Sequence, residues 1–217
     1  QAQLELLLFD DVDDARPARV IPLDRLRNRT AYYWHVFVPG VGPGQVYAWR
    51  VIDSSAILLD PYGLAVAVPA AYDRMAGTRA DRDPGTAMKS VVADLSTYDW
   101  EGDLPLGRPF ARTVVCELHV RGFTAHPNSG LDSQLAGTYA GLVVKIPYLR
   151  SLGITAVELM PVLAFDPQDA PPGLVNYWGY SPVSFFAPHS AYASTRDPIG
   201  ALDEFRTMVK ELHRAGI

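Results

Sequence analysis

Three polar side chains at the end of an apolar segment are the first residues of this sequence that could do chemistry. Glu117, His119 and Arg121 end the run that begins at Val114, which is predicted to be a strand. Because side chains alternate between the two faces of a strand, all three are expected on one face. Such a group could form a charged rim of an active site or a structural network of ion pairs. We favour the structural interpretation.

The other candidate residues are more isolated. Glu158 ends a second apolar segment and is open to the same two interpretations, of which we again favour the structural one. Asp166 and Asp169 are most simply solvated loop acids, and His189 is most simply a residue satisfied by hydrogen bonds. Cys116 lies in an apolar run, which favours a small buried hydrophobe over a nucleophile.

Metal and cofactor chemistry finds little support in the sequence. No spacing of His, Cys and carboxylate residues suggests zinc, and no cofactor is expected. A calcium site built from scattered oxygens stays open. The single cysteine allows no intramolecular disulfide, which suits a reducing, cytoplasmic compartment.

The composition is that of an ordinary globular protein with a mildly acidic charge. Of the 217 residues, 48% are hydrophobic and 20% are charged, and the formal net charge is −5. Without a block of Lys and Arg, nucleic acid and anionic membranes are poor partners. The apolar run at residues 6–9 is too short to span a bilayer.

The first part of the chain, residues 1–95, is predicted to be a small immunoglobulin-like β-sandwich. Leu4, Leu6 and Leu8 alternate with other residues, as in a half-buried strand. The segments 32–38 and 45–51 are rich in aromatic and β-branched residues and flank a Gly/Pro turn cluster. Residues 96–112 are expected to be a linker.

The last part, residues 113–217, alternates predicted strands and helices. Strands are expected over 114–120 and 154–160, and a helix near 146–152. A long loop covers 161–195, and Asp197 then caps a helix that has Pro198 at its first position. Four residues give this helix an apolar stripe, and four others should form its solvent face. The stripe comprises Leu202, Phe205, Val209 and Leu212; the solvent face comprises Asp203, Glu204, Lys210 and Glu211.

This alternation indicates the first two β/α units of a (β/α)8 barrel, whose sites lie at the carboxyl ends of the strands. A full barrel needs roughly 250 residues. We therefore expect the chain to be part of a longer protein, with Ile217 as the first residue of a third strand.

Several ordered segments resemble isoamylase-type glycogen-debranching enzymes of the α-amylase superfamily. In the barrel part they are ELHVRGFT (117–124), GTYAGL (137–142), TAVELMPV (155–162), NYWGYSP (176–182) and FFAP (185–188). Upstream, LLDPYG (58–63) and KSVVAD (89–94) are similar to the end of the carbohydrate-binding sandwich that precedes the barrel.

The resemblance implies hydrolysis of α-1,6 branch linkages in glycogen or a related α-glucan by a retaining mechanism. The family's catalytic carboxylates follow later barrel strands, beyond Ile217, so we assign no catalytic residue and expect the chain alone to be inactive. The resemblance also implies that Tyr180 stacks on the sugar where cleavage occurs, whereas Trp178 is expected to pack.

Other interpretations stay open. A branching enzyme, a pullulanase or a trehalose-releasing hydrolase could share this scaffold, and the chain could instead be a non-catalytic glucan-binding piece. Five aromatic residues of the first part could form a glucan platform or simply its core, and we name no binding residue among them. They are Tyr32, Trp34, Tyr47, Trp49 and Tyr62.

Overall fold

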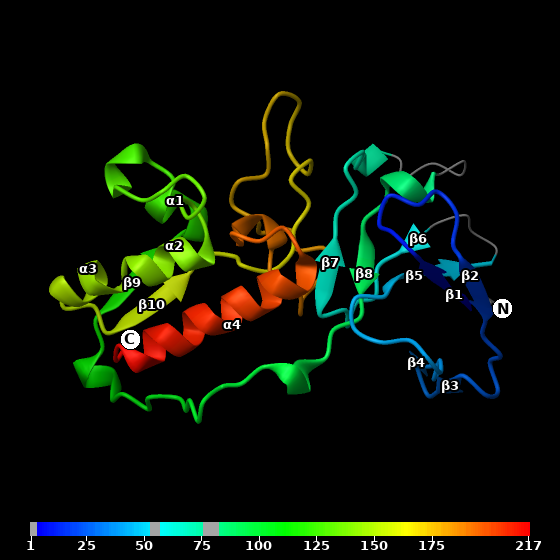
Figure 1. Cartoon of the computed structure of the whole chain (residues 1–217), viewed down its shortest axis with the longest axis horizontal. Coiled ribbons are helices and arrows are strands. Elements are labelled where there is room, and N and C mark those ends of the chain that lie inside the picture. Colours follow the sequence, from blue (N-terminus) through cyan, green and yellow to red (C-terminus); the bar gives the residue numbers. More distant parts are fainter. Residues whose placement is uncertain (1–3, 53–56, 76–82) are drawn as a thin grey trace.

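The computed structural model describes residues 4–52, 57–75 and 83–217, so the first three residues of the expected sandwich lie outside it. In Figure 1 an antiparallel sheet lies on the right, and a pair of strands with helices lies on the left. The segment that joins them runs along one side of the longest helix. Within the described residues, no helix is long and apolar enough to cross a membrane.

The first part is built on one antiparallel sheet of six strands in the order β2-β1-β5-β8-β7, with β6 also paired to β5. The strands are β1 Leu4–Phe9, β2 Arg19–Pro22, β5 Val46–Val51, β6 Ile57–Leu58, β7 Ala65–Ala67 and β8 Lys89–Val91. Both faces of this sheet are covered. Leu7 and Phe9 of β1 pack in one apolar cluster, and Leu6 and Leu8 pack in another on the opposite face.

The strand expected over 32–38 is wrong. Only β4, Tyr33–Trp34, forms there, and it pairs with β3, Arg29–Thr30, as a separate two-stranded sheet. Val36 and Val38 instead pack against the outer apolar cluster of the large sheet. A residue suited to a half-buried surface need not pair with a neighbouring strand, because it can instead pack on the face of a sheet.

In the second part, β9, Val115–Leu118, pairs in parallel with β10, Ala156–Leu159. The helices are α1 Val120–Thr124, α2 Tyr139–Val144, α3 Ile146–Ser151 and α4 Pro198–Arg214. Tyr139, Leu142, Leu149 and Met208 are fully buried in the cluster between them. The helix predicted near 146–152 and the strand over 154–160 are confirmed.

The start and end of α4 follow the sequence signals. The carboxylate of Asp197 accepts a hydrogen bond from the amide of Gly200 at 2.6 Å. Pro198 occupies the first turn, and Gly216 has a φ of 82° just after the end. Phe205, Val209 and Leu212 of the predicted apolar stripe pack in this core cluster, and Leu202 is buried outside it.

The expected solvent face of α4 is wrong for two of its residues. Lys210 is buried under the segment 96–112, where its ammonium contacts the carbonyl of Asp99 and the carboxylate of Glu101. Glu204 accepts hydrogen bonds from the amides of Ala140 and Ser194. The helix is therefore covered by polar chain on the side that its sequence left to water.

Candidate functional site

A cavity of about 480 Å³ lies at the carboxyl ends of β9 and β10. Its lining combines two carboxylates, apolar side chains and one tyrosine: Glu117, Glu158, Leu159, Met160, Pro161, Leu163, Gly179, Tyr180, Pro182 and Phe185. Tyr180 is 68% exposed. The flat face of an exposed ring on an open cavity is available to a ligand, whereas the face of a ring packed in the core is not.

The polar residues at the end of β9 do not share a face as expected. Glu117 is exposed in the cavity and is the register partner of Glu158 on β10. His119, in contrast, is buried as the N-terminal cap of α1, and Arg121 lies inside that helix. The strand ends before His119, so the alternation that would align the three side chains stops there.

His119 anchors the loop that carries Tyr180. Its Nδ1 accepts a hydrogen bond from the amide of Gly122 at 3.0 Å, so the neutral ring carries its proton on Nε2. That Nε2 lies 2.9 Å from the carbonyl oxygen of Tyr177, to which it donates. The two rings also stack, with centroids 4.3 Å apart. The interpretation of His119 as a structural residue therefore agrees with its contacts.

Asn176 closes the turn just before Tyr180. Its side-chain carbonyl accepts from the amide of Gly179 at 3.1 Å, and its amide nitrogen donates to the carbonyl of Asp166 and to Ser181. Gly179 is required here because its φ is 75° and a Cβ would lie 2.6 Å from the ring of Phe165. The turn therefore fixes the backbone on which Tyr180 stands.

His189 and Phe165 form the layer behind this turn. Their rings stack with centroids 3.8 Å apart. Burial, together with the nearby His119, lowers the pKa of His189 to about 4, so its ring is neutral at pH 7. A buried, stacked histidine with so low a pKa is a weak base, so it supports packing here and is a poor candidate for a general base.

Trp178 lies close to this site but lines no part of it. Its ring meets those of His119 and Tyr177 edge-on, with centroids 6.1 and 5.5 Å away. Half of its surface stays exposed, at 54%. Its contacts agree with the packing role expected from the sequence.

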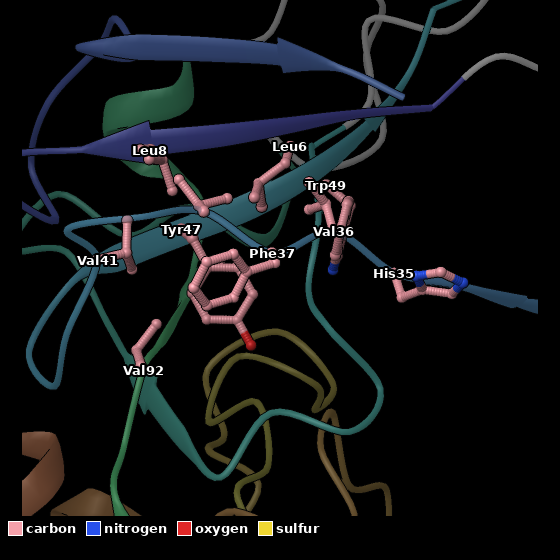
Figure 2. A pocket seen from close by; sticks show the side chains of 10 residues that line it. Leu6, Leu8, His35, Val36, Phe37, Val41, Tyr47, Trp49 and Val92 are labelled. Carbon is pink, nitrogen blue, oxygen red and sulfur yellow. The ribbon is translucent and has the colours of Figure 1, made fainter. Parts of the chain in front are cut away.

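A second hollow, of about 350 Å³, lies on the outer face of the large sheet (Figure 2). Leu6, Leu8 and Val36 surround the side chains of Tyr47 and Trp49 there. Trp34 joins the same apolar cluster, whereas Tyr32 and Tyr62 are exposed. Three of the five aromatic residues considered as a platform therefore contribute to core packing.

Two residues that support the site, Asp166 and Arg74, carry no signal of this role in the sequence. Asp166, expected to be a solvated acid, is buried, because Arg74 from the first part of the chain pairs with it. No local signal marks a partner so far away in sequence.

Within the described residues, no group of three or more His, Cys, Asp or Glu side chains could hold a metal ion.

Comparison with known proteins agrees with this architecture. Residues 2–63 match carbohydrate-binding module 48, the isoamylase N-terminal domain. Isoamylase 3 of rice chloroplasts is 41% identical over 94% of this chain, and a glycogen debranching enzyme of Serratia proteamaculans is 38% identical over 99%. The chain is thus similar, over nearly its whole length, to an isoamylase and to a glycogen debranching enzyme.

The fold is shared more widely. A multi-modular glycogen-degrading pneumococcal virulence factor superposes with a TM-score of 0.77 over 99% of this chain, at 21% identity. The chain spans 24% of that protein, and 28% and 34% of the rice and Serratia relatives. It therefore corresponds to about a third or less of each.

Proposed function

We propose that this chain is the substrate-binding, N-terminal portion of a glycoside hydrolase that cleaves α-1,6 branch linkages of glycogen or a related α-glucan. The observation that carries the proposal is the cavity at the carboxyl ends of β9 and β10, with the exposed ring of Tyr180 on its wall. The names of the two similar enzymes, an isoamylase and a glycogen debranching enzyme, point to the same chemistry.

The proposed architecture is an immunoglobulin-like sandwich over residues 1–95, a linker over 96–112, and the first two β/α units of a (β/α)8 barrel over 113–217. The sheet with both faces covered and the parallel pair β9–β10 support this division.

No catalytic carboxylate is assigned among these residues. A retaining reaction needs two carboxylates about 5–5.5 Å apart, and we place that pair in later strands of the longer protein. We also propose a cytoplasmic location.

Tyr180 is the proposed substrate-binding residue. A flat aromatic face matches the apolar C–H face of a glucose ring, and its electron-rich surface can stabilise the positive charge of an oxocarbenium-like transition state. The ring stands on a turn held by Asn176 and Gly179, so it is oriented before a ligand arrives.

The test is hydrolysis of branched glycogen by a longer protein that contains this chain. Tyr180→Ala should lower kcat/KM by about tenfold or more, whereas Tyr180→Phe should retain most of it, because the ring is kept. Phe110→Ala, which removes a 93% exposed ring that does not line the cavity, is the matched control. Equal activity of the Tyr180→Ala variant and the parent would remove Tyr180 from the site.

A non-catalytic glucan-binding role is the second candidate, favoured by the match of residues 2–63 to a carbohydrate-binding module. In that case the longer protein would retain α-glucan without hydrolysing it. Release of linear chains from glycogen distinguishes the two proposals.

A further inference from the structure

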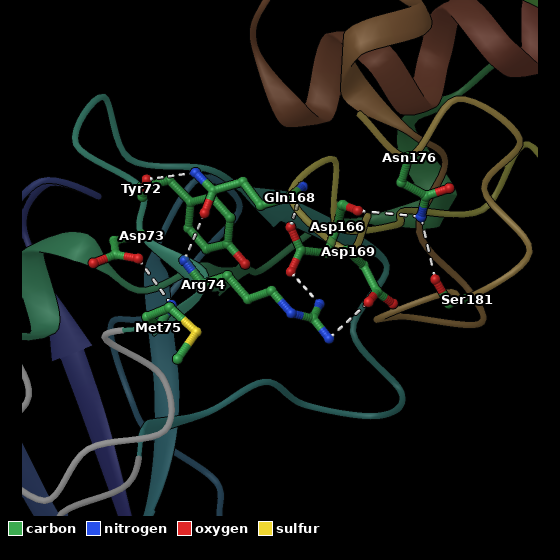
Figure 3. A network of polar contacts seen from close by, with 9 residues as sticks. All are labelled: Tyr72, Asp73, Arg74, Met75, Asp166, Gln168, Asp169, Asn176 and Ser181. Atoms are coloured by element: carbon green, nitrogen blue, oxygen red, sulfur yellow. Dashed lines mark hydrogen bonds and ion pairs between the residues drawn. The ribbon is translucent and has the colours of Figure 1, made fainter. Parts of the chain in front are cut away.

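A reciprocal polar contact joins the first part of the chain to the cavity loop, the segment 161–195 that carries Tyr180 (Figure 3). The backbone amide of Arg74 donates to the side-chain carbonyl of Gln168 at 2.8 Å, and the amide nitrogen of Gln168 donates back to the carbonyl of Tyr72 at 2.9 Å. This pair of hydrogen bonds resembles the pairing between two β-strands, and it joins segments that are more than ninety residues apart.

An ion pair strengthens the same contact. The guanidinium of Arg74 reaches the carboxylates of Asp166 at 2.5 Å and Asp169 at 2.9 Å (Figure 3). The side chain of Asp166 is only 3% exposed. A buried carboxylate needs compensating partners: Arg74 supplies positive charge to Asp166, and the backbone amide of Gln168 donates to the same carboxylate at 2.8 Å.

From Asp166 the contact continues to the cavity. The carbonyl of Asp166 accepts a hydrogen bond from Asn176, and the side-chain carbonyl of Asn176 accepts from the amide of Gly179. Gly179 and the following Tyr180 both line the cavity. Two hydrogen bonds therefore connect the partner of Arg74 to the backbone that carries the ring.

Apolar contacts seat the rest of the loop on the first part of the chain. Val66 and Met88 pack with Ala164 and Ala187 in one buried cluster. Nearby, the hydroxyl of Ser184 donates to the carbonyl of Gly63 at 3.1 Å, and the rings of Tyr62 and Phe186 stack. Both arms of the loop, before and after Tyr180, thus rest on the sheet.

We propose that the sandwich positions the cavity loop of the barrel, and that Arg74 is the positioning residue that holds Tyr180 in its glucan-binding geometry. The glucan part of this statement rests on the proposed function, whereas the mechanical coupling does not. The first part of the chain would then act on the site by fixing its loop, in addition to any glucan contact of its own.

Hydrogen exchange at the amide of Gly179 tests the coupling on the 217-residue chain, without any ligand. Arg74→Gln should speed this exchange by roughly tenfold or more relative to the Ala48 amide in β5, because a charged hydrogen bond is lost. Arg74→Lys should restore part of the protection. Arg50→Gln is the matched control, since Arg50 pairs with Glu5 at 2.7 Å within the sandwich alone.

Gln168→Ala gives a second variant should Arg74→Gln weaken the whole fold. It removes the reciprocal hydrogen bonds, leaves the buried ion pair in place and should also speed exchange at Gly179. Unchanged exchange at Gly179 in both variants, or equal acceleration at Gly179 and Ala48, would overturn the proposal.

Binding of maltoheptaose to a longer protein that contains this chain separates the coupling from the function. Arg74→Gln should weaken this binding. In a protein that already carries Tyr180→Ala, adding Arg74→Gln should weaken binding no further. If the parent itself fails to bind maltoheptaose while Gly179 responds to Arg74, the coupling stands and the proposed function fails.

Discussion

Burial changes the protonation of His189, whose ring lies flat against Phe165 behind the cavity loop. Its pKa falls from 6.5 to about 4 in the folded chain. Below pH 6.5 the unfolded chain therefore binds a proton that the folded chain does not, and stability is lost as the pH falls from 6.5 towards 4. The loss should reach about 3 kcal/mol, at about 1.4 kcal/mol for each pH unit.

Urea unfolding at pH 7, 5.5 and 4 measures this loss. The His189→Phe variant keeps an aromatic ring against Phe165 but has no titrating group, so it should lose less stability over the same interval. His126→Gln, at an exposed histidine, serves as the control and should keep the parent's dependence. An identical pH dependence in the parent and the His189→Phe variant would contradict this assignment.

At the scale of single residues, the sequence predicted what depends on neighbours along the chain. The motif around Tyr180 pointed to the ring that lines the cavity, because the turn residues Asn176 and Gly179 lie within four positions of it. Asp166 was mistaken for a solvated acid because Arg74, its partner, lies 92 positions away. Burial that depends on a distant partner leaves no mark in a local pattern.

Among the elements, α4 offers the cleanest test of a local signal. Asp197→Ala removes the carboxylate that accepts from the amide of Gly200, and should cost about 1 kcal/mol of unfolding free energy. Asp197→Asn should restore most of this, because its carbonyl can accept the same hydrogen bond. Asp10→Ala, at an exposed position outside any helix, controls for the loss of a charge. Urea unfolding provides the measurement, and a cost equal to that of Asp10→Ala would contradict a capping role.

The elements also show where pattern reasoning stops. A cap, a proline in the first turn and an apolar stripe together define α4, and each of these is local. The aromatic segment 32–38 satisfied the strand pattern equally well, yet only Tyr33–Trp34 pairs. Which segment joins a sheet and which one covers it is decided by the partners available, here β5 beneath Val36 and Val38. Similarly, the polar side of α4 indicated water, but segment 96–112 covers it.

At the scale of the whole molecule, we propose that this chain binds the glucan and that the rest of a longer protein supplies the catalytic carboxylates. We predict that the purified 217-residue chain releases no reducing ends from glycogen, because no catalytic carboxylate is assigned to it. A reducing-sugar assay beside the longer protein, at equal molar concentration, makes the comparison. Hydrolysis by the chain alone would show that its own residues, Glu117 and Glu158 first among them, do the chemistry.

The proposed debranching activity is tested by an assay of the longer protein on branched glycogen and on pullulan, which measures the linear chains released and the maltotriose formed. Debranching of the isoamylase type predicts linear chains from glycogen and little maltotriose from pullulan. Rapid formation of maltotriose would contradict it in favour of a pullulanase, and hydrolysis of neither polymer would contradict it in favour of a transferase such as a branching enzyme.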